Sequence, residues 1–280
     1  MGFAMRRGAA VLALFILAPL AAQAGEQSFT QTIKLKEKLD LAIVAGAGTV
    51  RISQGPEGRL TITGHVRAND WRPSDDRLRD IAANPPIERE GNTVRIGSAP
   101  PMAHAIIDYE IEAPADSVIE ASAGIGDIAD DGAGTSLHLS TGSGSIHASG
   151  ITGSIDASSK EGDIDLESDG TGEVKAETGT GNVALRNVHG ALRATSGEGN
   201  IQVAGVPAGD WTVETGKGNI EVALNQAACT IDARAREGLV ESDVRVEGAD
   251  KRDLQHVAGT IHGGGHSVTV RTGEGEIRIR

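Results

Sequence analysis

The chain has 280 residues, 38 of them glycine, and only 2% of its residues are aromatic. A hydrophobic fraction of 39% with 23% charged residues is too apolar for a disordered chain, and nine prolines without a Gly-X-Y period exclude collagen. The formal net charge of −13 argues against nucleic acid as a partner. The composition predicts an ordered protein with a thin core and many tight turns.

Residues 1–24 have the pattern of a secretory signal peptide. Two arginines precede an apolar stretch, residues 9–20, that is too short to span a bilayer, and Ala22-Gln23-Ala24 matches a small-x-small cleavage site. A retained anchor is the alternative, which the short stretch and Pro19 disfavour. We expect cleavage before Gly25, export to the periplasm or the cell surface, and no transmembrane segment in the mature chain.

Residues 25–115 are predicted to form an N-terminal cap and the first coils of a repeat fold. Residues 28–35 alternate as a cap strand, and the apolar pairs Leu41/Ile43, Val50/Ile52 and Leu60/Ile62 then follow one another at steps of nine and ten residues. We expect all three pairs to lie on successive coil strands.

The apolar pattern breaks at residues 69–91, where we expect a helical insert near 74–84. Ser74 is the predicted N-cap and Pro85-Pro86 the end of the helix. Strands are expected at 93–96 and 106–111, with residues 99–101 as a loop.

Residues 116–280 repeat one element: Thr or Ser, Gly, any residue, Gly, a polar residue, then Ile or Val. Thr141–Ile146 and Thr178–Val183 are two copies. The second glycine recurs at steps of 18 to 20 residues, and a last step of 37 is about two periods. The predicted turn glycines are Gly126, Gly144, Gly162, Gly181, Gly199, Gly218, Gly238 and Gly275.

Each glycine turn joins two short strands whose apolar residues are two apart, so they share one strand face. Leu137/Leu139 and Ile146/Ala148 are such pairs, with lead residues nine apart. This spacing predicts an all-β, single-domain parallel β-solenoid (a β-helix) with 18–20-residue coils and a short helical insert. A β-sandwich is the alternative, but it has no reason to repeat one turn at a fixed period.

Two features near the C-terminus complete the prediction. A loop or irregular coil is expected near 247–262, and Ile277–Arg280 is expected to be the last strand. Arginines on that strand would discourage end-to-end stacking of solenoids.

Several motifs resemble a known family, the bacterial putative-adhesin β-strand-repeat family, a domain of unknown function in exported and envelope proteins. They are Gly91–Ile96 after the helical insert, Tyr109–Pro114 leading into Gly126–Ile128, the repeated Gly-x-Gly turn, and the closing segment Gly264–Ile277. The resemblance covers roughly residues 35–280. It implies a β-solenoid with an envelope role and no established catalytic residues.

The polar residue after each second glycine is a candidate for a stacked ladder that binds calcium. Its members are Asp127, Ser145, Asp163, Asn182, Asn200 and Asn219. Calcium takes six to eight oxygen ligands, and most positions here are neutral. The favoured interpretation is a turn-stabilising amide ladder, with no cofactor.

Other polar groups have structural interpretations. Four acidic residues are expected at a solvated corner of the coils: Glu161, Glu198, Glu237 and Glu274. Five outward-facing residues are expected to be neighbours on successive strands and to support the register of the sheet: Glu120, His138, Asp156, Lys175 and Arg193. His262 and His266 flank a triglycine that will not be helical, so a surface loop is favoured over a zinc site. The single cysteine, Cys229, excludes an internal disulfide.

The pattern therefore favours a non-catalytic exported solenoid that acts as an envelope scaffold, adhesion or interaction module. Its partner would be an unknown envelope protein or a polysaccharide, not nucleic acid. One alternative is a carbohydrate-active β-helix enzyme with paired acids in 69–112 or 243–266, although the mature chain has few aromatics for sugar stacking. A calcium-stabilised repeat protein is the second alternative.

Overall fold

The computed structural model describes residues 26–68, 75–97, 105–250 and 252–280. The expected signal peptide, the Ser74 cap and the loop at 99–101 lie outside the described residues. Helix α1 spans Asp75–Ala83 and packs against the N-terminal strands β1 and β4. Within the described ranges, no helix has the length and apolar character needed to cross a membrane.

The strands of the described chain lie in two sheets of 12 strands each. Sheet A contains, in spatial order, β1 (Glu26–Lys34), β4 (Arg59–Ala68), β7 (Ala105–Ala113), β3 (Val50–Gln54), β9 (Ile128–Asp131), β11 (Ile146–Ile151), β13 (Ile164–Ser168), β15 (Val183–Val188), β17 (Ile201–Gly205), β19 (Ile220–Ala223), β24 (Ile277–Ile279) and β21 (Val240–Ser242). Sheet B contains, in spatial order, β22 (His256–Ile261), β20 (Cys229–Glu237), β23 (His266–Glu274), β18 (Trp211–Lys217), β16 (Leu192–Glu198), β14 (Val174–Thr180), β12 (Ser154–Glu161), β10 (Gly134–Ser143), β8 (Ser117–Ile125), β2 (Asp40–Ala47), β6 (Thr93–Ile96) and β5 (Ile87–Glu90).

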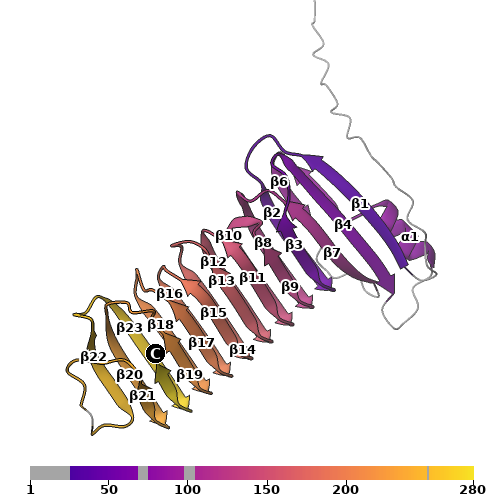
Figure 1. Ribbon diagram of the computed structural model, residues 1–280. Helices are drawn as coiled ribbons and strands as arrows, with labels where there is room; N and C mark the ends of the chain where they lie inside the picture. The colour runs from indigo at the N-terminus through magenta and orange to yellow at the C-terminus, as the bar shows by residue number, and fades with distance from the viewer. Residues whose placement is uncertain (1–25, 69–74, 98–104, 251) are drawn as a thin grey trace, which may run out of the picture.

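Successive coils stack as a parallel solenoid, which confirms the predicted fold class. A coil is one strand of sheet B, a Gly-x-Gly corner and one strand of sheet A, as in β10 and β11 (Figure 1). Equivalent residues pair in register between coils, for example Leu137 with Ile155 and Ile146 with Ile164. The 18-residue step therefore brings identical positions side by side.

The core is a set of apolar columns between the two sheets. Leu139 and the alanines Ala157, Ala176 and Ala194 line one column of sheet B, and all four are fully buried. Trp211 also points inward, and its indole Nε1–H donates to the Gly190 carbonyl at 2.9 Å. Small and branched side chains fill this narrow space, which explains the scarcity of aromatics.

The hydroxyl of the Thr/Ser-Gly-x-Gly motif ties each coil to its neighbour. Thr178 Oγ1 donates to the Gly162 carbonyl at 2.9 Å, and Ser196 Oγ donates to the Gly181 carbonyl at 2.9 Å. Both hydroxyl residues are buried. The motif therefore favours Thr or Ser, because the buried hydroxyl donates to a part-buried glycine carbonyl of the adjacent coil.

The spatial order of the coils at the C-terminus departs from the chain order. The last strands in the sequence, β23 and β24, lie between β18–β19 and β20–β21, so the C-terminus lies inside the stack (Figure 1). The expectation that Ile277–Arg280 is a free edge is wrong. Arg280 Nη1 lies 2.6 Å from Glu221 Oε1 on one neighbouring strand, and Arg278 Nη2 lies 3.0 Å from Asp243 Oδ2 on the other side.

The N-terminal coils show a similar inversion. Strands β2 and β3 lie between β6–β7 and β8–β9. Leu60 and Ile62 do not continue the coil path to sheet B as expected, because β4 stays in sheet A and pairs antiparallel with β7. Strand β1 then pairs antiparallel with β4 and closes this end of the sheet.

The segment near 247–262 is more ordered than expected. It contains strand β22, which pairs antiparallel with β20 at the edge of sheet B. Glu247 and Thr260 exchange backbone hydrogen bonds of 2.8 and 2.9 Å, which cover part of the outer edge of β22. The sequence pattern missed this strand because it reverses direction and does not follow the coil spacing.

Candidate functional site

The polar residues after the second glycines lie in one exposed column, as the spacing required, and we call it the corner ladder. It contains Asp127, Ser145, Asp163, Asn182, Asn200 and Asn219. Five backbone N–H groups of adjacent coils donate to its Oδ1 atoms. The distances are 2.8 Å (Ser145 to Asp127), 2.6 Å (Asn182 to Asp163), 3.0 Å (Asn200 to Asn182), 2.9 Å (Asn219 to Asn200) and 2.8 Å (Glu276 to Asn219). These are the contacts that an amide ladder makes.

The other residues singled out in the sequence lie apart from one another. His262 Nδ1 is 3.1 Å from the Gln226 carbonyl, and His266 Nδ1 is 3.9 Å from Asp210 Oδ1. Across the described ranges, no group of three or more His, Cys, Asp or Glu is placed to hold a metal ion. Cys229 is buried at the start of β20, and burial raises the pKa of its thiol.

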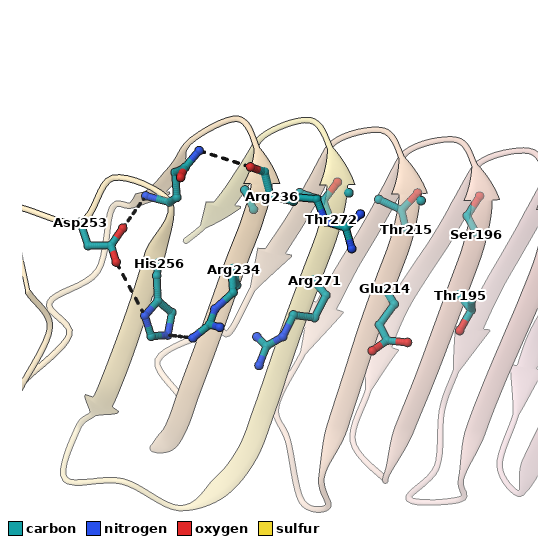
Figure 2. Close-up of a pocket in the computed structure, with 14 residues that line it drawn as sticks. Thr195, Ser196, Glu214, Thr215, Arg234, Arg236, Asp253, His256, Arg271 and Thr272 are labelled. Atoms are coloured by element: carbon teal, nitrogen blue, oxygen red, sulfur yellow. Dashed lines mark hydrogen bonds and ion pairs between the residues drawn. The ribbon is translucent and has the colours of Figure 1, made fainter.

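A hollow lies instead on the outer face of sheet B, near its C-terminal end. It has a volume of about 970 Å³ and crosses β16, β18, β23, β20 and β22 (Figure 2). A second hollow of about 830 Å³ continues it toward the N-terminus, and both are lined by Thr195. We call the combined feature the sheet B groove.

One row of side chains crosses the C-terminal half of the groove, one from each strand. The register aligns them in the order Thr195, Glu214, Arg271, Arg234 and His256, as Figure 2 shows. We call these five residues the outer row. Beside it, the first glycines of the turns, including Gly216 and Gly273, carry no side chain and leave the hollow open.

Asp232 organises the basic end of the outer row. Its Oδ1 lies 2.9 Å from His256 Nε2, and Arg271 donates to its carboxylate and, at 2.6 Å, to its backbone carbonyl. Burial raises the pKa of Asp232, but the hydrogen bonds from Arg271 and His256 outweigh burial and hold that pKa below its usual value. The carboxylate is therefore ionised at neutral pH and holds the side chains of Arg271 and His256 in place.

Comparison with known proteins assigns the fold to a family. The Toastrack DUF4097 family matches residues 107–280. The chain belongs to this family. The resemblance to a putative-adhesin repeat family is thereby confirmed.

Several solved structures are similar to this Toastrack chain at low identity. They include a putative cell adhesion protein from Clostridium sporogenes (16% identity, TM-score 0.29, covering 91% of this chain and 98% of that one), a putative adhesin from Parabacteroides distasonis (10%, 0.36, 91% and 97%) and a putative lipid binding protein from the same organism (12%, 0.36, 92% and 97%). The comparison with curated proteins returned no match.

Sequence reasoning missed the basic end of this Toastrack groove. Arg234 and Arg236 alternate with alanines on β20, and that pattern alone shows that both point outward. Arg271, however, is far away in the sequence and becomes their neighbour only because β23 lies beside β20. The inverted coil order therefore hid the site.

Proposed function

We propose that this chain is a non-catalytic, exported β-solenoid that serves as an envelope scaffold, adhesion or interaction module. The sheet B groove carries the proposal, because it offers a continuous polar surface across many parallel strands. Its partner would be an envelope protein or a polysaccharide, in the periplasm or at the cell surface. The family membership supports the fold that displays this surface.

The arrangement of the acids favours binding over glycan cleavage. Glycosidases work with two carboxylates flanking the scissile bond, one of them free to donate a proton. In the described part of the region 243–266, Asp243 is paired with Arg278 and Arg280. In the other region, Asp108 accepts from Arg67 at 2.9 Å and from the Thr49 backbone N–H at 2.7 Å. Measurable cleavage of any member of a glycan panel would overturn the non-catalytic proposal.

Co-sedimentation with isolated cell envelopes tests the interaction function. Thr195→Trp places a bulky side chain where the two hollows meet, so we expect it to reduce the bound fraction strongly. Thr212→Trp is the matched control, because Thr212 lies on β18 beside the groove and is not part of its lining. Equal binding of both variants and the original chain would show that the groove is not the contact surface.

We also propose that folding needs no calcium. The Oδ1 atoms of the corner ladder already accept backbone N–H groups, and this network holds the corners without a cation. The thermal melt of the mature chain should be the same with calcium and with a chelator. A fall of several degrees on chelation would instead support the calcium-stabilised alternative.

A further inference from the structure

The C-terminal end of the sheet B groove gathers three arginines, Arg234, Arg236 and Arg271, beside the carboxylate of Asp253, on an otherwise acidic protein. Arg271, Arg234 and His256 are consecutive in the outer row, and Arg236 lies two residues along β20 on the same face. The chain as a whole carries a formal charge of −13. In the lining of this hollow the three arginines outnumber the two carboxylates, Glu214 and Asp253, and this balance favours an anionic ligand.

Two of these arginines are available to a ligand. Within the described residues, the ion pairs at this end join Asp232 to Arg271 and to His256, and Asp253 to His256, and none involves Arg234 or Arg236. Both of the latter side chains are exposed and line the hollow. Arg234 Nη2 lies 3.4 Å from His256 Nε2, so part of this guanidinium is already engaged, whereas the Arg236 guanidinium makes no side-chain hydrogen bond within the described residues. The remaining N–H groups of the two arginines can bind a carboxylate.

The remaining surface of the groove argues against a peptide ligand. Peptides gain affinity from a free strand edge or from apolar pockets. Strands β18, β23 and β20 are each paired on both sides, and Ala235 is the one apolar residue in the lining of the larger hollow. A hydroxyl-rich ligand, by contrast, can exchange hydrogen bonds with Glu214 and the guanidinium groups.

We propose that the arginine end of the groove binds the carboxylate of an acidic oligosaccharide, a ligand class that deepens the proposed function and rests on it. The carboxylate lies on Arg234 and Arg236, and the sugar hydroxyls extend toward Glu214 and Thr195. Glu214 sets the orientation of the oligosaccharide, because its carboxylate would repel a ligand carboxylate placed at the Thr195 end of the outer row. Thr195 and His256 are four strand spacings apart, roughly 19 Å, which suits a short oligosaccharide.

Isothermal titration of the mature chain with trigalacturonate tests this assignment. The double variant Arg234→Ala/Arg236→Ala should lose roughly tenfold or more in affinity, because each charge-assisted hydrogen bond is worth 1.5 kcal/mol or more. The control Arg59→Ala/Arg193→Ala removes two exposed arginines outside the groove and should bind as the original chain does. The fully methyl-esterified trimer, which lacks the charge, should bind far more weakly.

Three results would overturn the assignment. They are no binding of trigalacturonate by the original chain, equal loss in the two double variants, and equal affinity for a triglutamate peptide. Thermal melts of both variants check that each is folded. If the original chain sediments with envelopes but does not bind trigalacturonate, the oligosaccharide assignment fails while the interaction function stands.

Discussion

At the residue scale, the second glycine of each turn satisfies two constraints at once. Gly144 has a φ of +150°, in the region that L side chains rarely adopt. A Cβ at this position would also lie 2.2 Å from the carbonyl oxygen of Gly126 in the adjacent coil. The corner needs glycine for its backbone conformation and for the close approach of the next coil.

Gly144→Ala should lower the free energy of unfolding by about 2–3 kcal/mol, because backbone strain and a steric clash act together. Gly91→Ala separates the two effects, since Gly91 has a φ of +65° with nothing within 4 Å of an added Cβ. We expect this control to lose only about 1–2 kcal/mol. Urea unfolding measures both, and equal losses would show that the close approach contributes nothing.

Asp130 is a polar residue at an inward position that the next coils fill with apolar side chains. It is 1% exposed and lies in register with Ile52 and Ala148. Its Oδ1 accepts the Ala133 N–H at 3.0 Å, while Oδ2 has no partner in the described structure. Burial raises the pKa of Asp130 to about 7, with the hydrogen bond from Ala133 opposing this rise and the neighbouring Asp131 adding to it.

This raised pKa makes stability depend on pH. The unfolded carboxyl titrates near pH 4, so between about pH 4 and 7 the folded state holds a proton that the unfolded state has lost. Stability should therefore fall as pH rises through this window, by up to roughly 4 kcal/mol from this group.

Asp130→Asn should remove this dependence, because the amide does not ionise and can still accept from Ala133. Urea unfolding at pH 5 and pH 8 gives the difference directly. Asp116→Asn, at an exposed turn, should keep the original slope. An unchanged slope in Asp130→Asn would mean that the carboxyl is not held neutral in the fold.

At the element scale, the sequence predicts the strands and corners within a coil, but not the order in which the coils stack. The spacing of Leu137, Ile146 and Ile155 defines strands, corners and inward faces, and all three appear as expected. Every coil, however, offers its neighbours the same backbone hydrogen bonds and nearly the same apolar column. Nothing in that pattern distinguishes β20 from β23 as the neighbour of β18, so the inverted order and the Arg234–Arg271 pairing could not be predicted.

Removing the last 15 residues tests the inverted order. A chain ending at Gly265 lacks β23 and β24, so β20 and β21 lose the coil on which they stack. Hydrogen exchange should then show full loss of protection in β20 and β21, while β12 to β17 stay protected. If β23 and β24 formed the outer end of the stack, protection in β20 and β21 would survive.

At the scale of the whole molecule, three of the four edge strands of the described sheets, β5, β22 and β21, are short, charged or partly covered. Sheet B ends at β5, four residues long with three charged side chains, and at β22, part of whose outer edge is covered by Glu247. Sheet A ends at β21, which has three residues, and at the antiparallel strand β1. Short, charged or covered edges prevent the open-ended association that exposed strands allow.

Because each coil contacts only its neighbours, stability is a sum of coil and interface terms, and a weak coil can divide the stack. Leu185 is 1% exposed on β15, near the middle of sheet A. Leu185→Ala should destabilise its coil by about 2–5 kcal/mol and split urea unfolding into two transitions, because the halves on either side become uncoupled.

Leu60→Ala makes the same change in β4, next to the N-terminal edge strand of sheet A. It should loosen only the N-terminal cap and leave one main transition, since the described residues place no coil beyond that end. Hydrogen exchange locates the difference, with protection lost around β15 in one variant and in β1 and β4 in the other. A single transition that shifts equally in both variants would contradict this prediction. It would show that the solenoid unfolds as one cooperative unit, in which coils are coupled beyond their nearest neighbours.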